Sequence, residues 1–348
     1  MALRIPAARS LPTSHKKDDP SSSPWSLPAP VPESVDPKQR GVALGLFAED
    51  VSFSYAPMLK EIAALGATHV ALVVPFYQTH AASTALKLHT RLSPSLEAIA
   101  DAIRLSRRAG LEVTLFPIVR LSEPRSPKEW RGTLAPADRD AWFASYGSLL
   151  ADLASLGALT GASRLVVGSE LSSLDGYETH WRPLVVRIRA LFPGTLVYSA
   201  NWDHYQDARL YDLVDEIGVV AYFNLREKDG PSDVPALTER WRHLRREIEF
   251  KLGVYDKPLV FTELGYRSRT GSTASPWDEG QGGVPDVDEQ TRAFQAFRQA
   301  WTAPGQAPSR LAGLYVWNWY GYGGSETTSY TPRGKPAVDV VRQILDEL

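Results

Sequence analysis

The sequence contains no cysteine, only two methionines and no long apolar run. Without cysteine the chain has neither disulfide bonds nor thiolate metal sites, although the redox compartment stays open. No stretch approaches the roughly 18 apolar residues of a membrane-spanning helix. The formal net charge is −2, from 38 basic and 40 acidic residues. The chain therefore lacks the excess of positive charge that would attract nucleic acid or an anionic membrane.

Motifs for metals and cofactors are also missing. The seven histidines show no ligand spacing such as H-E-x-x-H, and no glycine-rich dinucleotide or phosphate loop is present. The stretch Gly168-Ser169-Glu170 lacks the second glycine of a nucleophile elbow, which argues against Ser169 as an esterase nucleophile. We therefore expect neither a metal ion nor an organic cofactor.

Residues 1–40 differ in composition from the rest of the chain. They are rich in proline, serine and charge and show neither helical nor strand periodicity. Such a segment cannot bury enough apolar surface to offset the entropy of ordering, so we expect a flexible leader or tether. It contains no apolar core of a signal peptide. A tether of this kind is common in exported proteins and equally compatible with a cytoplasmic tail.

From Gly41 onward, apolar runs alternate with amphipathic stretches. This alternation favours parallel strands joined by right-handed helical crossovers. Eight such units in about 300 residues predict one domain over residues 41–348, a (β/α)8 TIM barrel with enlarged βα loops. A doubly wound open sheet fits less well, because no G-x-G-x-x-G follows the first strand. We expect strands at 42–47, 68–75, 111–119, 164–169, 195–200, 216–222, 259–263 and 311–318, and helices at 55–65, 95–109, 137–159, 177–191, 208–214, 236–252, 288–300 and 337–348.

Two of the expected strands end in a glutamate followed by leucine. The stretch that contains Glu170 reads RLVVGSEL, and the stretch that contains Glu263 reads KPLVFTELGY. Runs that are apolar on every face suit strands buried on both sides, where a carboxylate is costly unless it has a role or a partner. In a barrel the C-terminal ends of strands four and seven face one another. Such a pair provides the acid and the nucleophile or base of glycoside hydrolysis. The alternative is that each glutamate is a buried ion-pair partner, for example of Arg120.

Other polar and aromatic residues also fall at strand ends, where barrel enzymes place their reactive groups. A phenol such as Tyr222 would favour the ionised form of a neighbouring glutamate, as a nucleophile requires. The remaining candidates would bind substrate by hydrogen bonding or stacking, or else serve the structure of their loops. They are Arg120, Ser169, Asn201, Trp202, Asn224 and Trp317.

The motifs VVGSEL, AYFNL, VFTELGY and VWNWY occur in this order, each at an expected strand. In this respect the chain, from Gly41 to Leu348, resembles clan A glycoside hydrolases, and within that clan family 113, whose known members are retaining β-mannanases. The resemblance implies that Glu170 is the acid/base and Glu263 the nucleophile. It implies that Tyr222 hydrogen-bonds the nucleophile and that Trp317 forms the floor of the −1 sugar site.

One position departs from the clan pattern. Most members have an asparagine before the acid/base, where it binds the sugar 2-hydroxyl, whereas this chain has Ser169. Mannose carries an axial 2-hydroxyl, so a different partner at this position is compatible with mannosides. The sequence predicts a retaining β-glycosidase with a polysaccharide or oligosaccharide substrate, and the resemblance favours β-1,4-mannan or manno-oligosaccharides. The alternative is a carbohydrate-binding protein with weak catalysis on the same scaffold. An aldolase is not expected, because no strand end offers a lysine.

Overall fold

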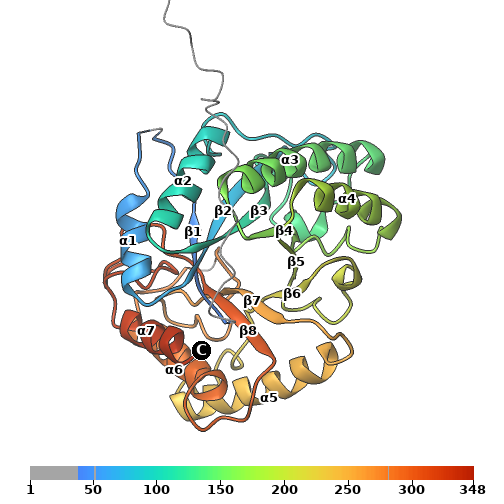
Figure 1. Cartoon of the computed structure of the whole chain (residues 1–348). Coiled ribbons are helices and arrows are strands. Elements are labelled where there is room, and N and C mark those ends of the chain that lie inside the picture. Colours follow the sequence, from blue (N-terminus) through green and yellow to red (C-terminus); the bar gives the residue numbers. More distant parts are fainter. Residues whose placement is uncertain (1–37, 51, 281) are drawn as a thin grey trace, which may run out of the picture.

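The computed structural model describes residues 38–50, 52–280 and 282–348. Eight parallel strands close into a barrel in sequence order, and β1 pairs with β8 to complete it. The helices surround the strands (Figure 1), which confirms the expected (β/α)8 fold. Residues 1–37, most of the expected leader, lie outside the described residues, and β1 begins at Gln39. The strands are β1 Gln39–Gly45, β2 His69–Gln78, β3 Glu112–Leu121, β4 Arg164–Ser169, β5 Thr195–Ala200, β6 Glu216–Val220, β7 Leu259–Leu264 and β8 Leu311–Val316.

The α-helices lie between these strands in the sequence. Several of them begin with a side-chain cap: the side chain of Ser95 accepts the amide of Ala98, and that of Asp138 accepts the amide of Ala141. The third helix ends at Gly161, which has φ 85°, a conformation that glycine adopts without a Cβ penalty. The helices are α1 Ala56–Ala64, α2 Leu96–Arg108, α3 Arg139–Thr160, α4 Glu178–Leu191, α5 Val234–Leu252, α6 Val287–Trp301 and α7 Ala337–Glu347.

The strands are buried on both faces, which explains their continuous apolar runs. Every residue of β2, β6 and β7 is buried. Outward-facing side chains pack under the helices, while a smaller cluster fills the barrel interior. That inner cluster extends from Ala43 and Val166 up to Tyr222 and Trp317 at the C-terminal ends of the strands. The fold therefore presents a solid barrel whose upper end carries the candidate residues.

A polar network closes the opposite end of the barrel. The Tyr315 hydroxyl donates to Gln39 Oε1 at 2.9 Å, and Gln39 Nε2 donates to Glu216 Oε1 at 3.0 Å. Arg164 bridges Glu216 and Glu112 at 3.3 and 3.1 Å. Four of these side chains belong to the first residues of their strands, so Arg164 and Gln39 provide partners for the two buried or half-buried glutamates at the N-terminal end.

The expected helix at 208–214 is wrong. Only a 3₁₀ turn forms there, at Tyr211–Leu213, so the described residues contain seven α-helices. The segment is too short to offset the cost of helix nucleation, and it leads directly into β6. Lys257 Nζ satisfies the carbonyls that a helix would have bonded, donating to Tyr211 O and Val214 O, both at 2.6 Å.

Among the described residues no helix is long and apolar enough to cross a bilayer.

Candidate active site

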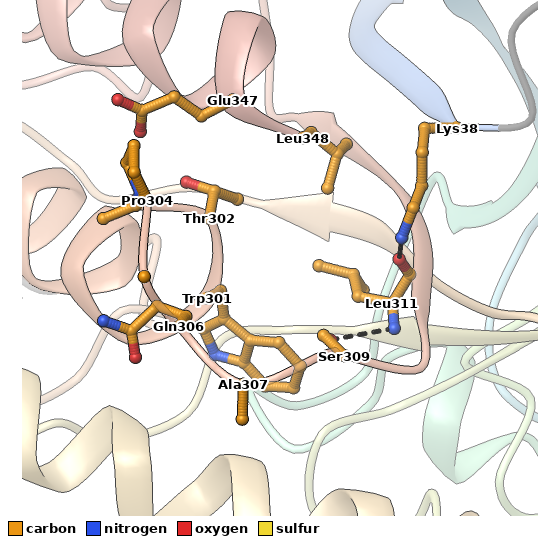
Figure 2. Close-up of a pocket in the computed structure, with 12 residues that line it drawn as sticks. Lys38, Trp301, Thr302, Pro304, Gln306, Ala307, Ser309, Leu311, Glu347 and Leu348 are labelled. Atoms are coloured by element: carbon orange, nitrogen blue, oxygen red, sulfur yellow. Dashed lines mark hydrogen bonds between the residues drawn. The ribbon is translucent and has the colours of Figure 1, made fainter.

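One cavity of about 270 Å³ lies at the N-terminal end of the strands. Figure 2 shows Lys38, which precedes β1, donating to the carbonyl of Leu311 at the start of β8, with Trp301 lying among the lining residues. Glu347 contributes its carboxylate, and this group is held by Arg298 Nε at 2.8 Å. This end carries none of the predicted site residues, so we do not place the chemistry there.

A second cavity, of about 370 Å³, opens at the C-terminal ends of the strands. It contains two of the predicted residues, Arg120 and Trp317. The cavity adjoins the glutamate pair through Arg131, which contacts Glu170. We call this space the upper cleft. Its lining residues are Phe47, Ile118, Arg120, Arg131, Arg267, Glu279, Trp317, Asn318, Tyr320, Ser329, Tyr330 and Thr331.

Glu263, near the end of β7, is only 1% exposed. The Tyr222 hydroxyl donates to Glu263 Oε2 at 2.9 Å, which is the hydrogen bond that the sequence predicted. Burial and the charge of Glu170 raise the pKa of Glu263 well above its usual value, against the opposing effects of Arg131 and Tyr222. Glu263 Oε1 is buried and has no hydrogen-bond partner among the described residues. This oxygen therefore keeps a hydrogen-bonding capacity that no described residue uses.

Glu170 follows β4 directly and is 4% exposed. Its backbone has φ 54°, the left-handed region that residues other than glycine rarely occupy, and its amide donates to Ser199 O at 2.8 Å. Arg131 Nε donates to Glu170 Oε2 at 2.6 Å, and Arg131 Nη2 also contacts that oxygen. The alternative ion-pair partner considered from the sequence, Arg120, is wrong: the arginine that pairs with Glu170 is Arg131.

The predicted binding residues form two groups. Trp202, after β5, lies 6.5 Å from Trp277 between ring centroids at an interplanar angle of 17°, and Trp277 Nε1 donates to Asn224 Oδ1 at 3.0 Å. Asn201 donates to Asp203 Oδ1 at 2.7 Å. The first group thus connects the loops that follow β5, β6 and β7.

The second group lies close to the glutamates or in the upper cleft. Ser169 precedes Glu170, and its hydroxyl is buried without a hydrogen-bond partner among the described residues. Trp317 lines the cleft beside Tyr330. Arg120 is exposed at the end of β3, with its guanidinium 5.8 Å from the Phe47 ring centroid.

Sequence reasoning missed several residues of the site. Arg131 lies within a long loop after β3, in a 3₁₀ turn over Arg131–Thr133 that no periodicity signals. Tyr330, whose ring lies 5.7 Å from that of Tyr222, comes from the long segment after β8. Trp277 and Glu279 come from the loop after β7. None of these residues adjoins a strand end, which was the signal that found the others.

The family model of Glycoside Hydrolase Family 113 matches residues 47–331. The chain belongs to this family. It is therefore a glycoside hydrolase of β-mannanase-like type with a carbohydrate substrate. No match was found among curated proteins.

Solved structures agree with this assignment. A family 113 β-mannanase, AaManA from Alicyclobacillus acidocaldarius in complex with ManMIm, is 28% identical, with a TM-score of 0.78 over 89% of this chain and 97% of that chain. A complex of a family 113 β-1,4-mannanase is 21% identical, with a TM-score of 0.78 over 89% and 99%. A β-D-glucuronidase from Dictyoglomus thermophilum shares the fold at a TM-score of 0.62 and 14% identity, over 89% of this chain and 51% of that chain.

Proposed function

We propose that this protein is a retaining β-glycoside hydrolase that cleaves β-1,4-mannan or manno-oligosaccharides by double displacement. The observation that carries the proposal is the pair of buried glutamates after β4 and near the end of β7, each held by a different partner. The names of the similar family 113 structures, a β-mannanase and a β-1,4-mannanase, support the choice of substrate.

Glu263 is the proposed nucleophile. Its carboxylate attacks the anomeric carbon to form a covalent glycosyl-enzyme, and the Tyr222 hydroxyl fixes the orientation of Oε2. Glu170 is the proposed acid/base: it protonates the leaving oxygen, then takes a proton from the water that hydrolyses the intermediate. Trp317 is the proposed floor of the −1 sugar site. The residues proposed to bind the remainder of the chain are Arg120, Ser169, Asn201, Trp202 and Asn224.

The two glutamates lie in different surroundings. Arg131 contacts the Glu170 carboxyl, while burial and the charge of Glu170 raise the pKa of Glu263, and Arg131 and the Tyr222 hydrogen bond oppose that rise. The first step needs a proton on Glu170 and a carboxylate at Glu263. Because a protonated carboxyl no longer forms an ion pair, we expect the contact between Arg131 and Glu170 to loosen when substrate binds.

The test is reducing-sugar release from mannan, glucomannan, cellulose, xylan and chitosan. The unsubstituted protein should release sugar from mannan, and Glu263→Ala and Glu170→Ala should each lose about 10²–10⁴-fold in rate. Asp152→Ala, an exposed carboxylate on α3, is the matched control and should keep full activity. Release from a different polysaccharide alone would overturn the substrate. Binding of oligosaccharide without release from any polymer would favour a carbohydrate-binding protein.

Rescue by azide distinguishes the proposed acid/base from the proposed nucleophile. In Glu170→Ala, azide should replace the base-activated water and restore turnover of an activated aryl mannoside, giving the β-azide. In Glu263→Ala, azide should replace the nucleophile and give the α-azide. The opposite pattern of anomers would exchange the roles of the two glutamates.

A further inference from the structure

Three guanidinium groups line the upper cleft. They belong to Arg120, Arg131 and Arg267, which we call the arginine cluster. The cleft lining includes one carboxylate to oppose them, that of the exposed Glu279. A neutral polysaccharide brings no charge into such a cleft, so the excess of positive charge calls for an explanation.

The three arginines differ in how far their charge is already compensated. Arg131 is paired with Glu170. Arg267 bonds neutral acceptors: Nε donates to Thr328 O at 2.8 Å, Nη2 to Thr328 Oγ1 at 3.2 Å, and Nη1 to Glu279 O at 2.5 Å. Within the described part of the chain, no carboxylate forms an ion pair with Arg267.

Arg120 is the member of the arginine cluster whose side chain has the fewest partners. It is exposed at the end of β3 and makes a cation–π contact with Phe47 at 5.8 Å. In residues 38–50, 52–280 and 282–348 its guanidinium has neither an ion-pair nor a hydrogen-bond partner. Its five N–H donors are therefore free to bind a ligand.

A fourth cation lies behind the cleft wall. Lys335 is 4% exposed, and its Nζ donates to the carbonyl and the hydroxyl of Ser329, a lining residue, at 3.1 Å each. Burial and the charge of Arg267 lower the pKa of Lys335 to about 8. It forms no ion pair with a described carboxylate, so Lys335 adds positive charge to a wall where Glu279 is the acidic lining residue, while Glu170 and Glu263 act on Arg131.

We propose that the upper cleft binds a β-linked chain in which one sugar unit carries a carboxylate, a uronic acid, held by Arg120 and Arg267. This rests on the proposed glycosidase function and narrows its substrate class. Planar guanidinium forks match the two oxygens of a carboxylate, and a cleft lined by one sign of charge concentrates ligands of the other sign. The contrasting possibility, that the arginines bind neutral hydroxyl groups, predicts no preference for an acidic unit.

The experiment compares two substrates that differ only in the carboxylate. One is a β-1,4-manno-oligosaccharide that bears uronic acid units, and the other is the same material after reduction of each carboxyl group to a primary alcohol. We expect kcat/KM of the unsubstituted protein to be about tenfold higher for the acidic form at low salt, equivalent to ~1.4 kcal/mol. The preference should shrink as ionic strength rises from about 0.02 to 0.3 M, because salt screens exposed charges.

Binding is measured in parallel on Glu263→Gln, which should not turn the ligands over. A preference for the acidic form in binding supports the inference even if no polymer is cleaved, in which case only the proposed function fails. Equal affinities for the two forms, together with normal cleavage of the neutral one, would overturn the inference and leave the glycosidase intact. If Glu263→Gln does not fold, the kcat/KM ratio of the unsubstituted protein decides.

Arg120→Gln is the main variant, because Arg120 makes no hydrogen bond that its loss would break. The acidic-to-neutral ratio should fall from about tenfold to about twofold, and Arg267→Gln should act in the same direction. Arg104→Gln, an exposed arginine paired with Asp101 on α2, is the matched control and should leave the ratio unchanged. A ratio that survives both cleft substitutions would contradict the assignment to the arginine cluster.

Discussion

Glu263 and Glu170 are chemically identical side chains in different surroundings. Glu263 receives one hydrogen bond from a neutral phenol and keeps one buried oxygen unpartnered, whereas Glu170 receives a guanidinium. Such asymmetry is how one fold assigns different roles to two carboxyl groups. Arg131 contacts the Glu170 carboxyl directly, so a change in that contact would change the surroundings of the proposed acid/base.

Substitution of Tyr222 by phenylalanine tests the surroundings of Glu263. Burial and Glu170 raise the pKa of Glu263, and the Tyr222 hydrogen bond opposes them, so its loss should raise that pKa further. Because the nucleophile must be ionised, the acidic limb of the kcat/KM profile should move to higher pH. An acidic limb that stays in place would show that Tyr222 does not act on Glu263.

At the scale of elements, the strand ends could be predicted from the sequence and the long loops could not. Both glutamates and their strands could be predicted, because a carboxylate at the end of a run that is buried on both faces is costly unless it has a role or a partner. Arg131 could not be found, since it lies in a long loop where a 3₁₀ turn of three residues leaves no periodic signal in the sequence. Trp277 was missed for the same reason, although its neighbours Trp202 and Asn224 were predicted from their strands.

The stacked pair of Trp202 and Trp277 joins two βα loops at the rim of the barrel. If these rings bind part of the carbohydrate chain, Trp277→Ala should raise KM for mannohexaose by about twofold to tenfold, the equivalent of ~0.5–1.5 kcal/mol of stacking. KM for a short mannoside should change less, because fewer of its units reach the rim. Phe250→Ala, which removes an 80% exposed ring on α5, is the control. Equal changes for long and short substrates would argue against a binding role.

Glu289 in α6 organises the loop after β7. It accepts the amides of Gly271 and Thr273 at 2.8 and 2.9 Å and the Thr273 hydroxyl at 2.6 Å, and it pairs with Arg226 at 3.4 Å. Glu289→Ala leaves these buried donors unsatisfied and should cost about 3–5 kcal/mol of unfolding free energy. Chemical denaturation at neutral pH measures the loss, with the neighbouring exposed Asp288→Ala as the control.

The contribution of Glu289 to the free energy of unfolding should depend on pH. Burial raises the pKa of Glu289, but the hydrogen bonds from Thr273 and Gly271 and the Arg226 charge outweigh it and hold that pKa below its usual value. Its stabilising contribution is therefore complete above about pH 4.5 and is lost as pH falls through the lower pKa of the folded state. The difference in stability between the unsubstituted protein and Glu289→Ala should shrink on acidification. A difference that is constant from pH 7 to 3 would contradict this linkage.

At the scale of the whole molecule, closure of the barrel depends on the contact between β1 and β8. A Cβ on Gly41 would lie 2.3 Å from a ring carbon of Tyr315 and 2.7 Å from the carbonyl oxygen of Leu314. The carbonyl cannot move without breaking strand pairing, so Gly41→Ala should cost about 1–3 kcal/mol of unfolding free energy. Gly176→Ala, where nothing lies within 4 Å, should change stability by less than about 0.5 kcal/mol. If the two variants were equally stable, the close contact between β1 and β8 at Gly41 would not limit the stability of the barrel.

The central claim is that Glu263 forms a covalent bond to the sugar during turnover. The most direct measurement is incubation with a 2-deoxy-2-fluoro-β-mannosyl fluoride, which slows hydrolysis of the intermediate, followed by mass spectrometry of the intact protein and its peptides. We expect one sugar per chain, attached to the peptide that contains Glu263, and no adduct in Glu263→Gln. Attachment to Glu170 would exchange the two roles. Continued turnover without any adduct would contradict covalent catalysis by this pair.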